Sequence, residues 1–134
     1  VELVNAASGL VLDSGGNVAP GSRLKQWYYD GSPNLQWQLR SLGNGYYEIV
    51  NEANGMVADS AGDRSNGAIA RQEPRNGSDD QQWSLYSAGR GLYHIINRAT
   101  GTALDGAGST SVGSSTILWA PNPSPNNEWT IAAT

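Results

Sequence analysis

The side chains that could carry acid–base or nucleophilic chemistry are few in this sequence. Its 134 residues contain no cysteine and one histidine, His94. Thiol nucleophiles and thiolate metal ligands are therefore excluded, and any serine–histidine–aspartate arrangement would depend on His94 alone. Carboxylates are the remaining candidates, and three of them, Asp13, Asp59 and Asp105, recur at a spacing of 46 residues.

The spacing of 46 residues also relates three tryptophan motifs. The segments 34–39, 80–85 and 126–131 each contain a tryptophan that is followed, two residues later, by an aliphatic residue. Since the whole chain has only five tryptophans, we interpret this spacing as a threefold internal repeat. The repeats are 1–46, 47–92 and 93–134, and the length fits one domain, 1–134.

Each repeat contains the same series of short, β-prone segments. An alternating run (1–5, 47–51 and 93–97) leads into an Asn-to-Gly turn, and a second run ends in the repeated aspartate. A Gly-rich loop and a third run follow, and the tryptophan motif supplies the fourth. No segment has helical periodicity. The pattern predicts an all-β domain with pseudo-threefold symmetry, and the β-trefoil, with four strands in each repeat, is the architecture that fits.

The three tryptophans of the motifs, Trp37, Trp83 and Trp129, are predicted to lie in the core around the threefold axis. An indole buries a large apolar area, so a recurring tryptophan is more often a core residue than a ligand contact. We expect the aliphatic residues two positions later to join them there: Leu39, Leu85 and Ile131.

Charge and hydropathy argue against several partners. The formal net charge of -4 is spread without any charge run, which argues against nucleic acid and anionic membranes. No apolar stretch approaches the roughly 20 residues that a membrane span needs. The chain begins at Val1 in a strand-like run, so we expect it to derive from a longer or processed precursor. We expect no cofactor and no metal.

The motif around Gln81 and Trp83, the Asn-x-x-Ser/Asn/Thr-Gly turns and the strand ends at the aspartates occur in register along the whole chain. This combination resembles the ricin-B-type β-trefoil lectins, equivalently the family 13 carbohydrate-binding modules attached to secreted glycoside hydrolases. The resemblance implies one shallow sugar pocket in each repeat. There an aspartate accepts hydrogen bonds from sugar hydroxyls, an aromatic residue stacks on the sugar ring, and motif amides add polar contacts.

In the first and third repeats the resemblance implies sugar-binding residues at these positions: Asp13, Trp27, Asn34, Asp105, Trp119, Asn126 and Asn127. The third repeat is the more complete, because Leu35 replaces the motif's glutamine in the first. Partial burial of Trp27 and Trp119 against loops is the alternative to stacking. A turn-stabilising role is the alternative for the aspartates, and a carboxylate has enough acceptor sites for both roles.

The second repeat is predicted to have a weak or lost site, at Asp59, Asp80 and Gln81. Glu73 stands where the other repeats have their stacking tryptophan. Asp59, Glu73 and Asp80 are expected to surround one former pocket and to be neutralised by the nearby arginines, Arg71 and Arg75. Clustered carboxylates also suit calcium, but no recognised calcium loop is present.

An autonomous enzyme is not expected. A glycosidase needs two carboxyl groups about 5 to 10 Å apart, whereas the repeated aspartates belong to three symmetry-related pockets. The counterparts of His94 in the repeat are Glu2 and Glu48, so His94 is expected to face solvent. Any catalysis would then reside in a separate, attached domain.

The expected function is that of a non-catalytic carbohydrate-binding module. The resemblance implies galactose-containing or related plant-type glycans as ligands, secretion, and targeting of an attached glycoside hydrolase to polysaccharide. Two alternatives remain open from the sequence. One is a module for xylan or arabinan, and the other is a trefoil used for protein contacts or inhibition without sugar binding.

Overall fold

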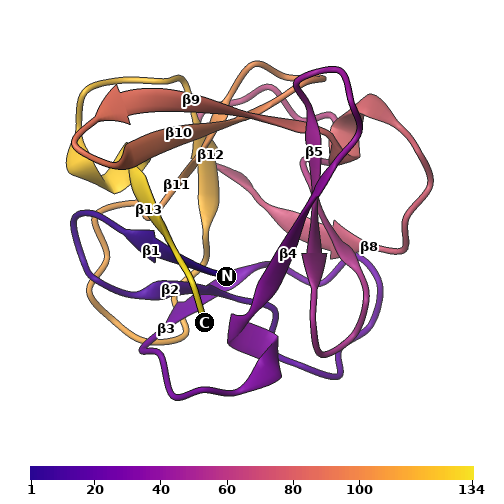
Figure 1. Cartoon of the computed structure of the whole chain (residues 1–134), viewed down its shortest axis with the longest axis horizontal. Helices are drawn as coiled ribbons and strands as arrows, with labels where there is room; N and C mark the ends of the chain where they lie inside the picture. The colour runs from indigo at the N-terminus through magenta and orange to yellow at the C-terminus, as the bar shows by residue number, and fades with distance from the viewer.

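The computed structural model describes the whole chain, residues 1–134, as an all-β domain with three repeats (Figure 1). The first repeat contains β1 (Glu2–Asn5), β2 (Val11–Asp13), β3 (Lys25–Trp27), the 3₁₀ helix η1 (Pro33–Leu35) and β4 (Trp37–Ser41). The second contains β5 (Tyr47–Asn51), β6 (Val57–Asp59), β7 (Ala68–Ile69), β8 (Arg71–Glu73), η2 (Asp79–Gln81) and β9 (Trp83–Gly89). The third contains β10 (Leu92–Asn97), β11 (Ala103–Asp105), β12 (Ile117–Trp119), η3 (Pro125–Asn127) and β13 (Trp129–Ala132). The predicted architecture is therefore confirmed, with short β7 as an addition.

Six strands form the barrel. Antiparallel pairs connect β4 with β5, β5 with β9, β9 with β10, β10 with β13, and β13 with β1. Hydrogen bonds between Val1, just before β1, and Trp37 of β4 close the ring. The Val1 amine donates to the Trp37 carbonyl oxygen at 2.8 Å, and the Trp37 N–H donates to the Val1 carbonyl oxygen at 2.8 Å. The pairing of β1 with β13 places the two termini near one another (Figure 1).

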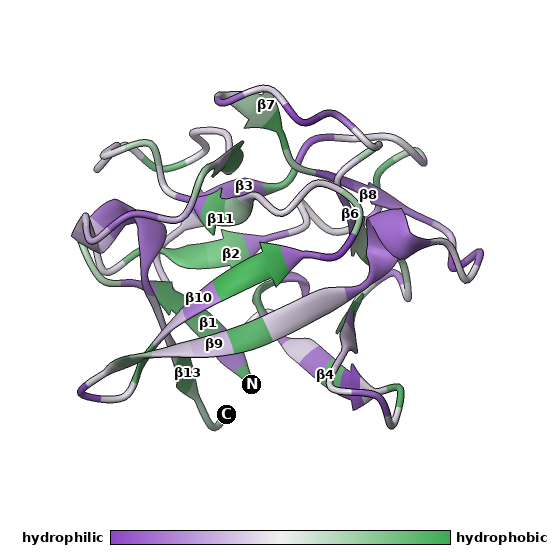
Figure 2. Cartoon of the chain, turned by 90° about the horizontal axis from the view of Figure 1, so that it is seen from above, coloured by the Kyte–Doolittle hydropathy of each residue, from purple (hydrophilic) through white to green (hydrophobic).

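The remaining strands form a second layer over one end of the barrel. They pair as β2 with β3, β6 with β8, and β11 with β12, and β7 joins β12. In Figure 2, β3 and β7 lie at one end of the molecule and β4 and β13 at the other. None of the chain's helices is long and apolar enough to cross a membrane.

The core contains Trp37, Trp83 and Trp129, all fully buried, as predicted. Each indole Nε1 donates to the backbone carbonyl oxygen of the residue just before a repeated aspartate: Leu12 at 3.0 Å, Ala58 at 3.1 Å and Leu104 at 2.8 Å. The core tryptophans therefore also fix the strand ends from which the aspartates project. Leu39, Leu85 and Ile131 pack against this core but are only partly buried.

The three Asn-to-Gly turns brace the tryptophan motifs. Asn5 shows the arrangement: its Oδ1 accepts the N–H groups of Ala7 and Ser8, and its Nδ2 donates to the Asn126 carbonyl oxygen at 3.0 Å. Asn51 and Asn97 make the corresponding bonds. These buried asparagines are structural, since each satisfies backbone groups of its own turn and of a neighbouring motif.

Candidate ligand-binding pockets

A pocket of about 340 Å³ lies in the third repeat, between the end of β11, the end of β12 and η3. We call it the third-repeat pocket, and its lining is Asp105, Ala107, Ile117, Trp119, Asn122 and Asn126. Trp119 is 41% exposed, which is high for so large an apolar side chain. The pocket thus combines an open indole face with a carboxylate and amides, and three of the predicted residues do meet here.

Asp105 is held rigidly although it borders the pocket. Its Oδ1 accepts the Ala107 N–H at 2.6 Å and the Asn126 amide at 2.9 Å, while its Oδ2 accepts the Asn127 amide at 3.0 Å. A carboxylate offers about four acceptor positions, so one remains for a ligand hydroxyl. The turn-stabilising role is therefore present and leaves room for a binding role.

Asn127 does not line the pocket. Its side chain is fully buried behind Asp105, so the expected direct contact with a ligand is wrong. Its amide instead donates to Asp105 and its Oδ1 lies 2.9 Å from His94 Nδ1. Gln81 takes the corresponding place in the second repeat, where it is fully buried and donates to Asp59 Oδ2 at 3.0 Å. This motif position orients the aspartate from behind.

The stacking position in each repeat packs against a glycine of another repeat. A Cβ at Gly67 would lie 3.7 Å from Trp119 Cζ3, and a Cβ at Gly113 would lie 3.4 Å from Trp27 Cζ3. Gly21 takes the same place beside Glu73. Each wall is thus supported across a repeat boundary.

A second pocket, of about 400 Å³, lies in the first repeat. We call it the first-repeat pocket, and its lining is Asp13, Gly15, Lys25, Trp27, Tyr28, Asp30 and Asn34. Asp13 Oδ1 accepts the Gly15 N–H at 2.7 Å and the Asn34 amide at 2.8 Å. Leu35 is buried at the position that Gln81 and Asn127 hold in the other two repeats, so it offers no amide to Asp13. The three residues predicted for this repeat are therefore together, but the carboxylate has one fixed partner fewer.

The first-repeat pocket is also more highly charged than the third. Lys25 and Asp30 both line it. The pKa of Asp30 is lowered, first by a side-chain hydrogen bond with Ser32 and then by the Ser32 backbone N–H, so Asp30 stays ionised at neutral pH. Four of the residues that line the two pockets were not predicted from the sequence: Lys25, Tyr28, Asp30 and Asn122. Asp30 and Asn122 occupy the same position of the 46-residue repeat. A polar residue repeated at that position could have indicated a further pocket residue.

The second repeat forms no comparable pocket. Asp59 accepts the Ala61 N–H at 2.6 Å and is held by Gln81, but Asp80 replaces the amide that Asn34 and Asn126 provide. Two carboxylates therefore face each other without a shared donor. The pKa of Asp80 is raised by burial first, and then by the negative charges of Asp59 and Asp79.

The arginines do not neutralise this acidic site, contrary to expectation. Arg75 Nε lies 2.8 Å from both carboxylate oxygens of Glu48, which is only 1% exposed, and Arg71 donates to the Gly21 carbonyl oxygen at 3.1 Å. A buried carboxylate needs a charged partner more than a solvated one does. Asp59, Glu73 and Asp80 do not form a group of carboxylates that could hold a metal ion.

His94 does not face solvent, which corrects a further expectation. Its side chain is 14% exposed, and its Nδ1 lies within hydrogen-bond distance of the Asn127 carbonyl oxygen and of Asn127 Oδ1. Nε2 is 3.9 Å from Glu128 Oε2. The reason is that this position of β10 faces the η3 segment, just as Glu48 on β5 is buried beside Arg75.

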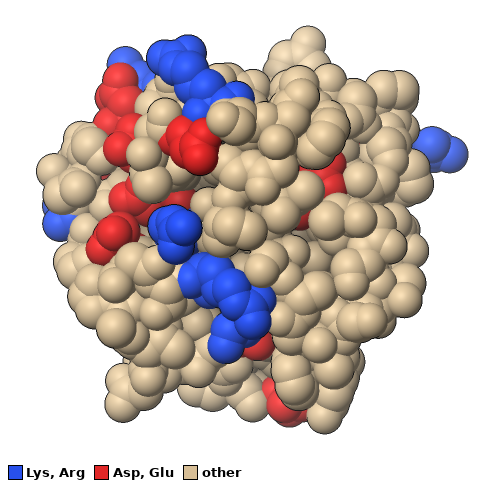
Figure 3. Space-filling view, turned by 180° about the vertical axis from the view of Figure 1, so that it is seen from behind, with Lys and Arg blue, Asp and Glu red and all other residues tan.

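Charged side chains of both signs are neighbours on the molecular surface. On the face shown in Figure 3, basic and acidic groups lie side by side, and large areas carry neither. This face therefore carries no broad surface of one sign that would attract a polyanion or a polycation.

A model of the "ricin-type beta-trefoil lectin domain-like" family matches the chain over residues 1–73, 33–119 and 79–134. The protein belongs to this family. A comparison with curated protein sequences gives no match.

Solved structures agree with this assignment. The chain is similar to the designed threefold-symmetric protein ThreeFoil, with 34% identity, a TM-score of 0.95, and coverage of 99% of this chain and 97% of that one. It is also similar to an exo-β-1,3-galactanase from Clostridium thermocellum, with 33% identity and a TM-score of 0.87. That match covers 96% of this chain but 29% of the galactanase. A Macrolepiota procera ricin B-like lectin in complex with lactose, at 20% identity, a TM-score of 0.81, and coverage of 96% and 90%, shares the fold.

Proposed function

We propose that the protein is a non-catalytic carbohydrate-binding domain that binds galactose-containing glycans through the third-repeat pocket and the first-repeat pocket. The observation that carries the proposal is the pairing, in one open pocket, of the exposed Trp119 indole with an Asp105 carboxylate fixed by three donors.

The chemistry of this pocket suits a sugar. A pyranose has an apolar C–H face and a fringe of hydroxyls, and it needs an aromatic wall and a few oriented polar groups. Trp119 offers the wall, Asp105 a free acceptor position, and Asn126 and Asn122 further polar groups. The third-repeat pocket contains one carboxylate, whereas hydrolysis of a glycosidic bond uses two, which supports binding without catalysis.

Galactose is the proposed ligand class because of the similar proteins. One is a β-1,3-galactanase and another was solved with lactose, a galactose-containing disaccharide. The chain spans 29% of the galactanase. We therefore propose that this protein also serves a secreted glycoside hydrolase, by retaining it on a polysaccharide.

Two pockets on one rigid domain fit this role. A shallow site for one or two sugar units has a dissociation constant near ~1 mM, or about 4 kcal/mol. A polymer that engages both pockets gains from the high effective concentration of the second site. The expected result is strong retention on a polysaccharide and weak binding of a monosaccharide.

Tryptophan fluorescence and calorimetry test the proposal. The protein is titrated with galactose, lactose and β-1,3-galactan, beside xylan and arabinan. Binding of the galactose-containing ligands should disappear in the Trp27→Ala, Trp119→Ala double variant. Val112→Ala, which removes an exposed apolar side chain outside both pockets, is the control and should bind normally.

The other outcomes are equally definite. A preference for xylan or arabinan, lost in the same double variant, would keep the sites but overturn galactose as the ligand. No response across a broad glycan panel would overturn the carbohydrate proposal and leave the protein-contact alternative.

A further inference from the structure

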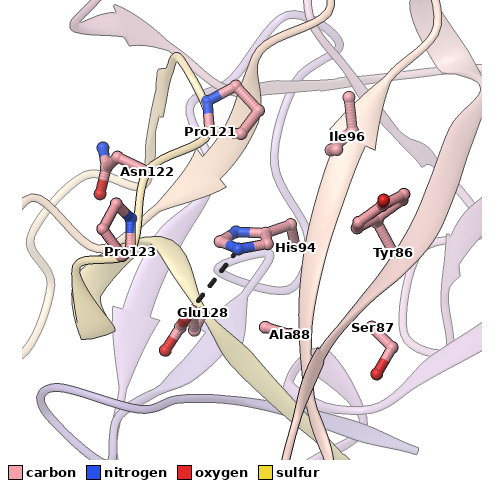
Figure 4. Close-up of a pocket in the computed structure, with 9 residues that line it drawn as sticks. All are labelled: Tyr86, Ser87, Ala88, His94, Ile96, Pro121, Asn122, Pro123 and Glu128. Carbon is pink, nitrogen blue, oxygen red and sulfur yellow. Dashed lines mark ion pairs between the residues drawn. The ribbon is translucent and has the colours of Figure 1, made fainter.

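A groove of about 440 Å³ runs beside the third-repeat pocket, between the β9–β10 hairpin and the loop before η3 (Figure 4). We call it the side groove. Tyr86 and Ile96 lie along one side, Pro121 and Pro123 along the other, and His94 lies between the two sides (Figure 4). None of these five residues lines the third-repeat pocket.

The side groove and the third-repeat pocket are adjacent. Asn122 lines both. Asn127, buried between them, donates its amide to Asp105 on one side and offers its Oδ1 to His94 Nδ1 on the other. A glycan that extends from the third-repeat pocket past Asn122 would therefore point toward the side groove.

The groove also presents polar atoms of defined character. His94 Nδ1 faces two acceptor oxygens of Asn127, at 3.1 and 2.9 Å, so it must carry the hydrogen. Nε2 is left toward the groove, 3.9 Å from the Glu128 carboxylate. With Tyr86, which is 68% exposed, the groove has an aromatic side and a polar end, the same combination as the third-repeat pocket.

The second repeat has no such groove, and its side chains explain the difference. At the equivalent place Arg75 lies over the buried Glu48, with its Nε 2.8 Å from both carboxylate oxygens. In the frame of 46 residues, His94 replaces Glu48 and Pro121 replaces Arg75. A compact proline ring stands where a long arginine side chain would otherwise fill the space.

We propose that the side groove binds the second sugar unit of a glycan whose terminal unit occupies the third-repeat pocket. This inference rests on the proposed function, because it assigns the next subsite of the same binding site. The apolar face of the second unit packs against Tyr86 and the prolines, and its hydroxyls bond to His94 Nε2 and the Glu128 carboxylate.

The test isolates the third repeat by using Trp27→Ala as the background. Calorimetry then compares galactose with the β-1,3-, β-1,4- and β-1,6-linked galactobioses. At least one disaccharide should bind about tenfold more tightly than galactose, as expected for one added aromatic contact. Adding Tyr86→Ala should reduce that ratio to within about twofold while leaving galactose affinity unchanged.

Arg40→Ala is the matched control, because Arg40 stands 46 residues before Tyr86, in the first repeat, and lies beside Glu48, the counterpart of His94. It should leave the ratio unchanged. In the wild-type chain, the methyl signals of Ile96 should shift in NMR spectra with the tight disaccharide and not with galactose.

The results separate this inference from the proposed function. If the sugars bind but no disaccharide gains over galactose, or if the gain survives Tyr86→Ala, the side groove is not a subsite and the proposed function stands. If neither galactose nor any disaccharide binds even to the wild-type chain, both fall together.

Discussion

The second and third repeats share their framework and differ at their pockets. Both have a buried aspartate at the strand end, a buried amide behind it and a core tryptophan bonded to the preceding carbonyl. They differ in front of the aspartate, where Glu73 and Asp80 replace Trp119 and Asn126. The comparison teaches that residues behind the aspartate serve the fold, so they persist where the residues that face a ligand have changed.

The amide behind the aspartate is therefore a poor guide to binding. The motif around Gln81 matches the family pattern best, yet its repeat has no pocket comparable with those of the other two. Buried Gln81 also donates to the Pro74 carbonyl oxygen at 2.9 Å and accepts the Asn76 N–H at 2.8 Å. These bonds satisfy the backbone of the loop and stay necessary without a ligand.

The largest expected effect is a difference in stability between variants of the core tryptophans and variants of the exposed ones. Trp83→Ala should lower the free energy of unfolding by about 3 to 5 kcal/mol, because it leaves a large cavity in the shared core. Trp119→Ala should change it by less than about 1 kcal/mol and abolish binding at the third repeat. Urea unfolding followed by circular dichroism measures both, and equal losses of stability would contradict the division between core and pocket.

Restoring a sugar pocket in the second repeat is the converse test of this comparison. Glu73→Trp combined with Asp80→Asn restores the wall and the amide in the second repeat. In a Trp27→Ala, Trp119→Ala background, this pair should raise galactose binding from undetectable to a dissociation constant near ~1 mM. Calorimetry measures it, with Glu73→Leu plus Asp80→Asn as the control without a ring. Binding by the control would show that stacking is not required.

Asp80→Asn alone should stabilise the protein by about 1 kcal/mol at neutral pH, as it removes charge repulsion and allows a hydrogen bond to Asp59. The figure is modest because Asp80 is partly solvated. The raised pKa of Asp80 means that the folded state holds this proton more tightly than the unfolded chain. The destabilisation is thus absent below the ordinary value of 3.8 and grows as pH rises through the raised pKa.

Urea unfolding at neutral pH and near pH 3 checks this sign. The advantage of the asparagine variant should shrink at the lower pH. Asn126→Asp is the mirror control, and it should introduce a similar, pH-dependent loss in the third repeat. An advantage that is equal at both pH values would exclude charge repulsion as the cause.

The smallest effect concerns the first repeat, where Leu35 replaces the amide behind Asp13. Leu35→Gln should tighten galactose binding at the first-repeat pocket by about threefold, since one more donor orients the carboxylate. Calorimetry in a Trp119→Ala background measures it. An unchanged affinity would mean that the Asn34 amide and the Gly15 N–H already hold Asp13 well enough.

The spacing of 46 residues predicted much of this molecule. It predicted the repeats, the strand ends and the buried tryptophans, because strand pairing and core packing impose the same residue types at the same positions three times. The family resemblance, applied in the frame of this spacing, predicted that Asp105, Trp119 and Asn126 lie together, and likewise Asp13, Trp27 and Asn34.

The spacing could not give the direction in which each side chain points. Asn126 and Asn127 are adjacent amides, but one lines the pocket and the other is buried behind it. Arg75 lies near the pocket acids in sequence, yet it pairs with Glu48, 27 residues away, because that carboxylate is buried. The side groove was missed for the same reason, since only the structure shows that the Arg75 side chain lies over Glu48 whereas Pro121 leaves His94 open to the groove.

The glycines beneath the stacking positions bear on how such a protein changes over time. Trp27 rests beside Gly113 and Trp119 beside Gly67, in each case from a different repeat. A single 46-residue unit moved by recombination would therefore carry its aspartate but leave behind the support of its wall. Each such pocket depends on residues from two repeats, so a mutation in one repeat can disable the pocket of its neighbour.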